Sequence, residues 1–146
     1  METYQSGKFY STVSPKFTDK GVCVIPEPTI TPIYQDKRGK AWSIKFDGRE
    51  LVLIFSREGA YRGGHYHTKP EVSLLLTGKA EYTKKIGKEE YHFVQTPGHL
   101  LTNDALEPHL AHFLADSWLV DWKTAEGEYL TVNIPKYRKI VEKSLE

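Results

Sequence analysis

From Gly59 to Gly78 the chain reads GAYRGGHYHTKPEVSLLLTG, and this stretch carries the clearest chemical signal in the sequence. His65 and His67 are two residues apart, and Glu71 follows four residues later. Residues two apart on a strand point to the same face, so both imidazoles, and Glu71 if the strand continues, converge on one side of a sheet. Two imidazoles and a carboxylate make most of the ligand set of a divalent transition metal. The stretch therefore predicts a metal site on a β-sheet.

Two adjacent glycines, Gly63 and Gly64, stand directly before the first of these histidines. Glycine inside a strand is typical of a β-bulge or a sharp bend. We expect these two residues to form such a feature and to aim His65 inward.

Composition limits the class of protein. The chain has 146 residues, the size of one ordinary domain with a real core. Lys and Arg number 20 against 19 Asp and Glu, so no basic surface is indicated and nucleic acid is not expected as a partner. The single cysteine, Cys23, excludes an internal disulfide framework and a cysteine-based zinc site.

No segment of the sequence indicates export or membrane insertion. Residues 1–14 lack the apolar run of a signal peptide, and no apolar stretch approaches the length of a membrane span. We expect a cytoplasmic protein whose residues 1–146 form a single domain. Its parts are an N-terminal arm with strands (1–34), a barrel (35–134) and a C-terminal helix (135–146).

Short apolar or alternating runs, separated by Gly, Pro, Asp or Asn, fill the chain from residue 41 onward. Strands of this length and spacing favour an all-β sandwich or barrel. Asp47-Gly48 and Ile86-Gly87 are typical of turns between paired strands. The expected strands are Trp42–Phe46, Leu51–Arg57, Val72–Leu76, Ala80–Ile86, Glu90–Gln95, Leu110–Leu114, Trp118–Trp122 and Tyr129–Ile134.

Only the C-terminal end indicates a helix. Pro135 suits the first helical position, and Tyr137, Ile140, Val141 and Leu145 then fall on one stripe. We expect this stripe to pack on the barrel wall or on a partner subunit.

The glycines that flank the histidine pair lead to a family. Gly59, His65-x-His67, Glu71 and Gly78 stand at the spacings of the first signature motif of the cupin superfamily, and the chain resembles a cupin over roughly residues 35–125. The resemblance implies a double-stranded β-helix, also called a jelly-roll barrel, with a metal site inside it.

A fourth metal ligand must come from the second half of the chain, where His99, His109 and His112 are candidates. The second cupin motif places a histidine eleven residues after a glycine, and His109 stands eleven residues after Gly98. The resemblance therefore implies His109 as the ligand. On a strand, Ala111 and Phe113 then share its face while His112 points outward.

The second motif departs from the family pattern in its middle. Asp104 and Leu106 stand where the family usually has proline and glycine, and Phe113 replaces the usual asparagine.

Three histidines and one glutamate leave coordination positions open, which is typical of a catalytic metal. Imidazole and carboxylate ligands suit Fe(II), Mn, Ni, Co or Zn, and the sequence does not select among them. The predicted ligands are His65, His67, Glu71 and His109.

Three further residues are candidates for catalysis. Arg62 precedes the first ligand and is expected to hold a substrate carboxylate or phosphate, with a surface ion pair as the alternative. Tyr82 and Tyr91, on strands expected to be central, are candidates for donating a hydrogen bond or a proton in the cavity, with simple packing roles as the alternative.

A second, shorter resemblance concerns sugars. The turn Asp36-Lys37-Arg38-Gly39, and Arg62 with the glycines that follow it, are similar to segments of cupins that act on nucleotide-linked sugars. The Gly63-x-His65-x-His67 stretch, followed by Lys69 and Glu71, is similar to the metal-binding cupin domain at the C-terminus of some capsular polysaccharide biosynthesis reductases. The alternative for the first turn is an ordinary Asx turn.

Together these features favour a metal-binding cupin enzyme of the isomerase or epimerase type, acting on a small polar substrate such as a sugar or sugar nucleotide. An Fe(II) dioxygenase, a non-catalytic binding module for carbohydrate or another small molecule, and a metal-free epimerase with a histidine base are the alternatives. By analogy with small cupins we expect a homodimer, joined through N-terminal strands and sheet edges.

Overall fold

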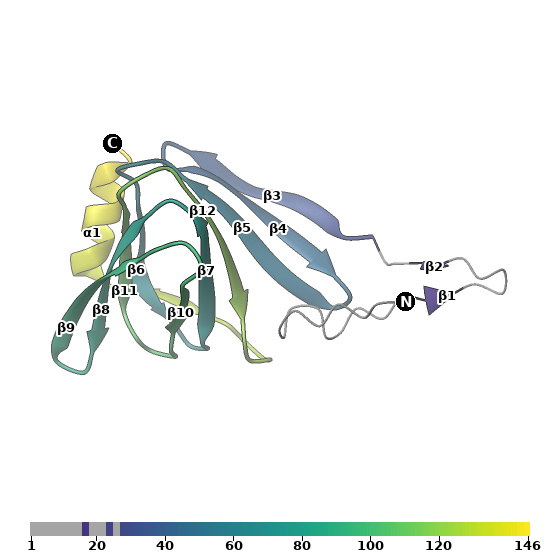
Figure 1. The fold of residues 1–146 in the computed structure, drawn as a ribbon. Coiled ribbons are helices and arrows are strands. Elements are labelled where there is room, and N and C mark those ends of the chain that lie inside the picture. Colours follow the sequence, from purple (N-terminus) through teal and green to yellow (C-terminus); the bar gives the residue numbers. More distant parts are fainter. Residues whose placement is uncertain (1–15, 18–22, 25–26) are drawn as a thin grey trace.

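The computed structural model describes residues 16–17, 23–24 and 27–146, and these form two facing antiparallel sheets with one helix (Figure 1). The fold is all-β, as the sequence predicts. The six-stranded sheet has the order β10 (Leu100–Asn103), β7 (Glu71–Thr77), β12 (Ser117–Lys123), β5 (Arg49–Ser56), β4 (Gly39–Phe46) and β3 (Thr29–Asp36). The five-stranded sheet has the order β13 (Thr131–Asn133), β6 (Tyr61–His67), β11 (His109–Phe113), β8 (Ala80–Ile86) and β9 (Glu89–Gln95).

A short pair, β1 (Lys16–Phe17) and β2 (Cys23–Val24), precedes these sheets. Most of the expected N-terminal arm, and the side chain of Cys23, lie outside the described residues. No helix within the described part of the chain is both long and apolar enough to cross a membrane.

The core fills the space between the two sheets because both sheets turn alternate residues inward. Leu75 and Leu119 from one sheet and Phe113 from the other are almost fully buried. The same core cluster contains Ala41, Ile54, Ala60, Ala80, Tyr82, Leu101 and Ala111.

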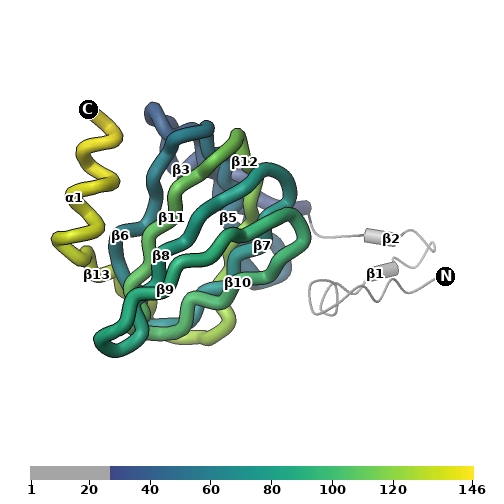
Figure 2. Tube along the Cα trace, turned by 60° about the vertical axis from the view of Figure 1, so that its left-hand side comes forward, coloured from purple at the N-terminus to yellow at the C-terminus, as the bar shows by residue number. Residues whose placement is uncertain are grey.

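Helix α1 (Pro135–Ser144) packs on the outer side of the five-stranded sheet (Figure 2). Pro135 begins it, as expected, and Tyr137 and Val141 are buried against Leu110 of β11. Ile140, predicted to share the buried stripe, is 39% exposed, so that part of the prediction is wrong. The buried stripe is narrower than expected because one sheet covers only one side of the helix.

Each expected strand is present within three residues of its predicted bounds, but β3 begins inside the predicted arm. Pro32 lies in this strand, where the pairing with β4 shifts register before Tyr34. Proline excludes a helix but is accepted in an edge strand, and β3 is the edge of its sheet. The short strand β10 was also not predicted, since it follows the turn at Pro97-Gly98 directly.

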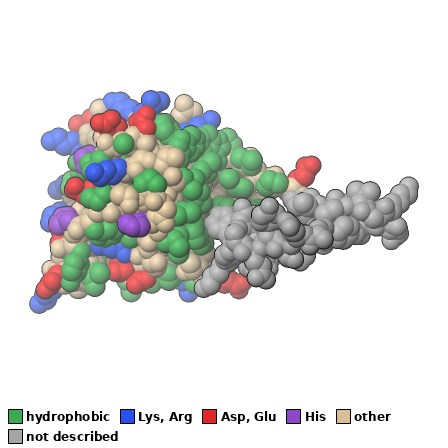
Figure 3. Space-filling model, in the orientation of Figure 1, with side chains coloured by type: hydrophobic (Ala, Val, Ile, Leu, Met, Phe, Trp, Pro, Cys, Tyr) green, Lys and Arg blue, Asp and Glu red, His purple; other side chains and the backbone are tan. Residues whose placement is uncertain are grey.

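The outer face of the six-stranded sheet is rich in large apolar side chains. Trp118 stacks on Trp42 with ring centroids 5.8 Å apart and lies 5.0 Å from the ring of Phe55. Figure 3 shows hydrophobic side chains gathered over this side of the molecule and charged side chains concentrated toward the helix end.

Leu106, at the position where the resemblance implies a glycine, has a backbone conformation that favours glycine. Its φ is +67°, in the left-handed region that disfavours side chains, and its N–H donates to the His67 carbonyl at 2.8 Å. This bond ties the segment before β11 to the end of β6.

We predict that Leu106→Gly raises the free energy of unfolding by about 0.5–1 kcal/mol, because relief of the left-handed strain exceeds the entropy that glycine adds to the unfolded chain. Leu106 is 63% exposed, so little packing is lost. The midpoint of urea unfolding measures the change.

Leu100→Gly is the matched control, since Leu100 is 65% exposed but lies in strand β10. We expect it to lower stability. Equal destabilisation by both changes would contradict the assigned strain.

Candidate metal centre

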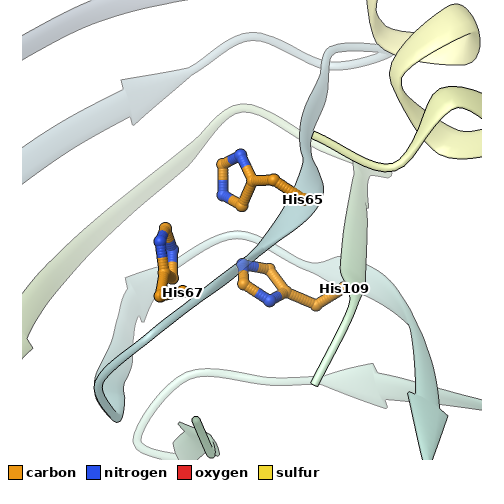
Figure 4. A group of neighbouring side chains, drawn as sticks. All are labelled: His65, His67 and His109. Carbon is orange, nitrogen blue, oxygen red and sulfur yellow. The ribbon is translucent and has the colours of Figure 1, made fainter. Parts of the chain in front are cut away.

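Three histidines converge between the sheets. His65 on β6 pairs directly with His109 on β11, and His67 follows two residues later on the same face of β6. Their ring centroids lie 4.5–5.1 Å apart, and one ring nitrogen of each lies within 4.8 Å of the others (Figure 4). The structure brings His109, rather than His99 or His112, to the predicted pair.

A β-bulge in β6 aims the first histidine inward. The register with β11 pairs Leu110 with Gly63 and His109 with His65, so Gly64 is an extra residue without a partner. Both glycines have positive φ values, +85° and +77°, as the predicted bulge requires. In a regular strand Arg62 and His65 would face opposite sides of the sheet, because they are three positions apart. The bulge turns both side chains to the same side.

Hydrogen bonds fix the orientation of two imidazole rings. Nδ1 of His109 lies 3.1 Å from the carbonyl oxygen of Glu107, which can only accept, so this nitrogen carries the proton and Nε2 keeps its lone pair. Nδ1 of His67 lies 3.0 Å from the hydroxyl of Thr131 on β13. Such partners orient histidines that bind metals.

The imidazoles are neutral at neutral pH. Burial lowers the pKa of His65 to about 3 and the pKa values of His67 and His109 to about 4, from an ordinary 6.5. Repulsion from neighbouring imidazoles lowers the pKa of His65 and His67 further. Neutral imidazole is the form that binds a metal, so the donor set fits a divalent transition metal.

Glu71 reaches the histidines from the opposite sheet, so its expected place on the same strand is wrong. The chain leaves β6 after His67, turns at residues 68–70 and enters the six-stranded sheet at Glu71. Pro70 interrupts the pleat because it cannot continue the ladder of hydrogen bonds. The carboxylate nevertheless lies 3.6 Å from Nε2 of His67, a separation that two ligands of one ion can have.

Tyr129 holds this carboxylate. Its hydroxyl donates to Glu71 at 2.9 Å, while its ring stacks on His67 with centroids 4.6 Å apart. The ammonium group of Lys123 also contacts Tyr129 and lies 4.2 Å from the centroid of its ring. Burial raises the pKa of Glu71, and the Tyr129 hydrogen bond opposes that rise.

A cavity of about 280 Å³ opens at the three histidines and is lined by residues of both sheets and of α1. Arg62 lines it but is already engaged, with Nε 2.6 Å from the Ser56 hydroxyl and Nη2 3.0 Å from the Phe55 carbonyl. Tyr82 also lines it, and burial raises the pKa of its phenol, which stays protonated.

Tyr91 is not brought to the cavity. It lies on β9, which is an edge strand and not a central one as expected, and it is 47% exposed. Its hydroxyl donates to Glu89 at 3.3 Å.

The other histidines lie away from the cavity. His112 points outward, as expected, and stacks on Tyr61 with centroids 4.1 Å apart. His99 lies beside Thr96 in a turn, and His92 is exposed next to Glu90.

Sequence reasoning missed three residues of this site. Tyr129 and Arg138 come from the C-terminal segment, which has no spacing relation to the motifs. Asp121 lines the cavity from β12, and burial raises its pKa well above the usual range. The one signal in the sequence that could have indicated Asp121 is its position between apolar residues, Val120 and Trp122, in a predicted strand.

Comparison with known proteins places the fold. No family model and no curated protein matches the chain. Among solved structures, the capsular polysaccharide assembling protein CapF from Staphylococcus aureus is 20% identical, with a TM-score of 0.59 over 68% of this chain and 30% of its own. A mutant of Bacillus subtilis oxalate decarboxylase OxdC is 16% identical, with a TM-score of 0.63 over 72% of this chain and 30% of its own.

Vicilin from hazelnut (Corylus avellana) is 11% identical, with a TM-score of 0.55 over 73% of this chain and 34% of its own. This chain thus spans about a third of the length of these proteins. A further structure of the B. subtilis oxalate decarboxylase describes Mn(II) centres in that enzyme. At these identities the likeness establishes the fold.

We predict that the purified chain binds close to one divalent metal ion, measured by elemental analysis after loading with Mn, Fe or Zn and desalting. His65→Ala and His67→Ala should each abolish retention through desalting, because the three ligands that remain cannot hold the ion tightly enough.

His112→Ala is the control, since this imidazole is stacked outside the cavity. Equal metal loss in the control, or full retention in both ligand variants, would contradict the assignment.

Tyr129→Phe should weaken metal affinity about 10- to 100-fold without changing the one-to-one ratio, because it removes the hydrogen bond that orients Glu71 and keeps the stacked ring. Competition with a coloured chelator measures the affinity. Tyr91→Phe, which removes an exposed hydroxyl, should have no effect, and a matching loss there would count against the role of Tyr129.

Proposed function

This chain has the fold of the cupin superfamily, and we propose that it is a metal-dependent enzyme that isomerises or epimerises a small sugar or a related polar substrate. The convergence of three neutral imidazoles inside a cavity carries the proposal. A purely structural metal site would be closed by its ligands, whereas this one faces an open space.

Four residues would hold the ion: His65, His67, His109 and Glu71. When bound, a divalent metal supplies a Lewis acid that polarises a carbonyl or hydroxyl oxygen of the substrate. Glu71 lies on the other sheet, where its carboxylate accepts a hydrogen bond from Tyr129, and it would complete the ligand set from that side. The open part of the cavity is left for the substrate.

The cavity wall limits what the substrate can be. Its volume of about 280 Å³ lies just below the roughly 300–1,000 Å³ of ligand pockets and supports a sugar rather than a whole sugar nucleotide. Tyr82 lines the cavity, is 4% exposed and is protonated, which supports a role as a hydrogen-bond donor to a substrate oxygen. The apolar residues around it, Leu119 and Phe113, keep water from this part of the wall.

The names of two structural neighbours support a site for a small polar molecule. CapF carries the name of a capsular polysaccharide assembling protein, and oxalate decarboxylase is named for a small carboxylic acid. Their names describe those proteins and support, for this chain, a site for a small polar molecule.

The test is proton exchange in heavy water. Metal-loaded protein is incubated with a panel of aldoses, ketoses and their phosphates in D₂O and followed by NMR. An isomerase or epimerase moves a proton at the carbon beside the carbonyl, so we expect deuterium to enter there even when net conversion is small. His65→Ala should abolish the exchange, whereas His112→Ala should retain it.

Two other results would overturn the proposal. Consumption of O₂ together with substrate, measured with an oxygen electrode, would instead indicate a dioxygenase. A rise in melting temperature with a sugar that shows no exchange and no O₂ consumption would indicate a non-catalytic binding module.

A further inference from the structure

The cavity has an excess of positive charge. Three arginines line it: Arg38 from the β3–β4 turn, Arg62 from β6 and Arg138 from α1. Two carboxylates line it as well, Glu71 and Asp121, and Glu71 is the predicted partner of the metal. A divalent ion at the histidines would make the cavity more positive still.

The charge of Arg38 is compensated locally. Its guanidinium contacts the carboxylate of Asp36 at 2.7 Å, and its backbone N–H donates to the same side chain at 2.8 Å. The Asp36-x-Arg38-Gly39 segment is therefore an Asx turn with an internal ion pair, and the charge of Arg38 is already paired.

Arg62 is a buried cation without a carboxylate partner among the described residues. It is 8% exposed, and no carboxylate of residues 27–146 lies within ion-pair distance of it. Each of its three guanidinium nitrogens instead donates to a neutral oxygen, of Ser56, Tyr34 or Phe55. Buried charges are normally paired, so this cation leaves a positive potential in the cavity.

Arg138 reaches the cavity because β6 has a glycine where α1 crosses it. A Cβ on Gly64 would lie 3.0 Å from the backbone nitrogen and Cα of Arg138, closer than packed atoms normally approach. The Gly64 carbonyl also accepts a hydrogen bond from Ile134 at the start of the helix. The same bulge that aims His65 inward therefore seats the helix and brings its arginine to the metal centre.

The guanidinium of Arg138 is only partly engaged. Nη1 donates to the Gly63 carbonyl at 3.2 Å, and Nε lies 3.4 Å from Glu142 but makes no hydrogen bond. Nη2 has no hydrogen bond within the described part of the chain. The Glu142 side chain is 63% exposed, so water screens its charge.

We propose that the substrate is an anion and that Arg138 binds its charged group, a carboxylate or a phosphate, beside the metal centre. Arg62 stands behind this site as a fixed positive charge. A guanidinium with free donors binds either group through charge-assisted hydrogen bonds. This inference rests on the proposed function and adds the substrate class to it.

The test is calorimetric titration of the metal-loaded protein with malonate, with its neutral isostere malonamide, and with inorganic phosphate. We expect malonate or phosphate to bind and malonamide to bind at least tenfold more weakly. The stronger of the two anions identifies the group that the site prefers.

Variants separate Arg138 from general charge effects. Arg138→Gln should weaken anion binding roughly 10- to 100-fold, and Arg138→Lys should retain part of the affinity because it keeps the charge. Lys139→Gln removes one positive charge from the next, exposed position of α1 and should leave binding unchanged. Thermal unfolding and metal content of each variant show that fold and metal centre are intact.

Equal anion affinity in wild type and Arg138→Gln, or equal binding of malonate and malonamide, would overturn the inference. The proposed function fails separately, through absence of metal binding or of proton exchange. Titration of the chelator-treated protein keeps the two apart, because Arg138 should still favour malonate or phosphate over malonamide when no metal is present.

Discussion

Gly64 adds one residue to β6 that has no partner on β11, and the local shift in register organises the site around it. The extra residue turns Arg62 and His65 to the same side of the sheet, which simple alternation would forbid. It also removes the Cβ that would keep α1 away from the strand. One backbone irregularity therefore sets the direction of the first ligand and the position of a helix that begins 71 residues later.

The centre depends equally on both sheets. The three imidazoles belong to the five-stranded sheet, while Glu71 belongs to the six-stranded one. The core between the sheets therefore sets the distance between the carboxylate and the imidazoles. Burial in that core keeps the imidazoles neutral. The hydrogen bond between His67 and the Thr131 hydroxyl, and the one that His109 donates to the Glu107 carbonyl, limit ring rotation. The packing of the core therefore sets both the positions of the candidate ligands and the neutral state of the imidazoles.

Charge is distributed unevenly over the wall of the cavity. The three histidines line one part of the wall, and Arg62 adds a buried positive charge that no carboxylate of the described residues pairs with. Such a buried charge costs stability, and a protein recovers that cost when a ligand of opposite charge binds. The same wall carries apolar residues such as Phe113, so a small ligand would meet charge and apolar surface together.

The sequence alone determined the all-β fold, the positions of most strands, the histidine pair and the bulge before it, because alternation and glycine conformation are local properties. It also indicated His109 through the motif spacing. Only the tertiary structure decided that Glu71 comes from the other sheet and that Tyr91 lies on an exposed edge. It also decided that Tyr129 donates a hydrogen bond to Glu71 and that Arg138 lines the cavity. These facts depend on how separate segments fold across one another, and a period of two residues specifies the face of a strand but not its neighbours.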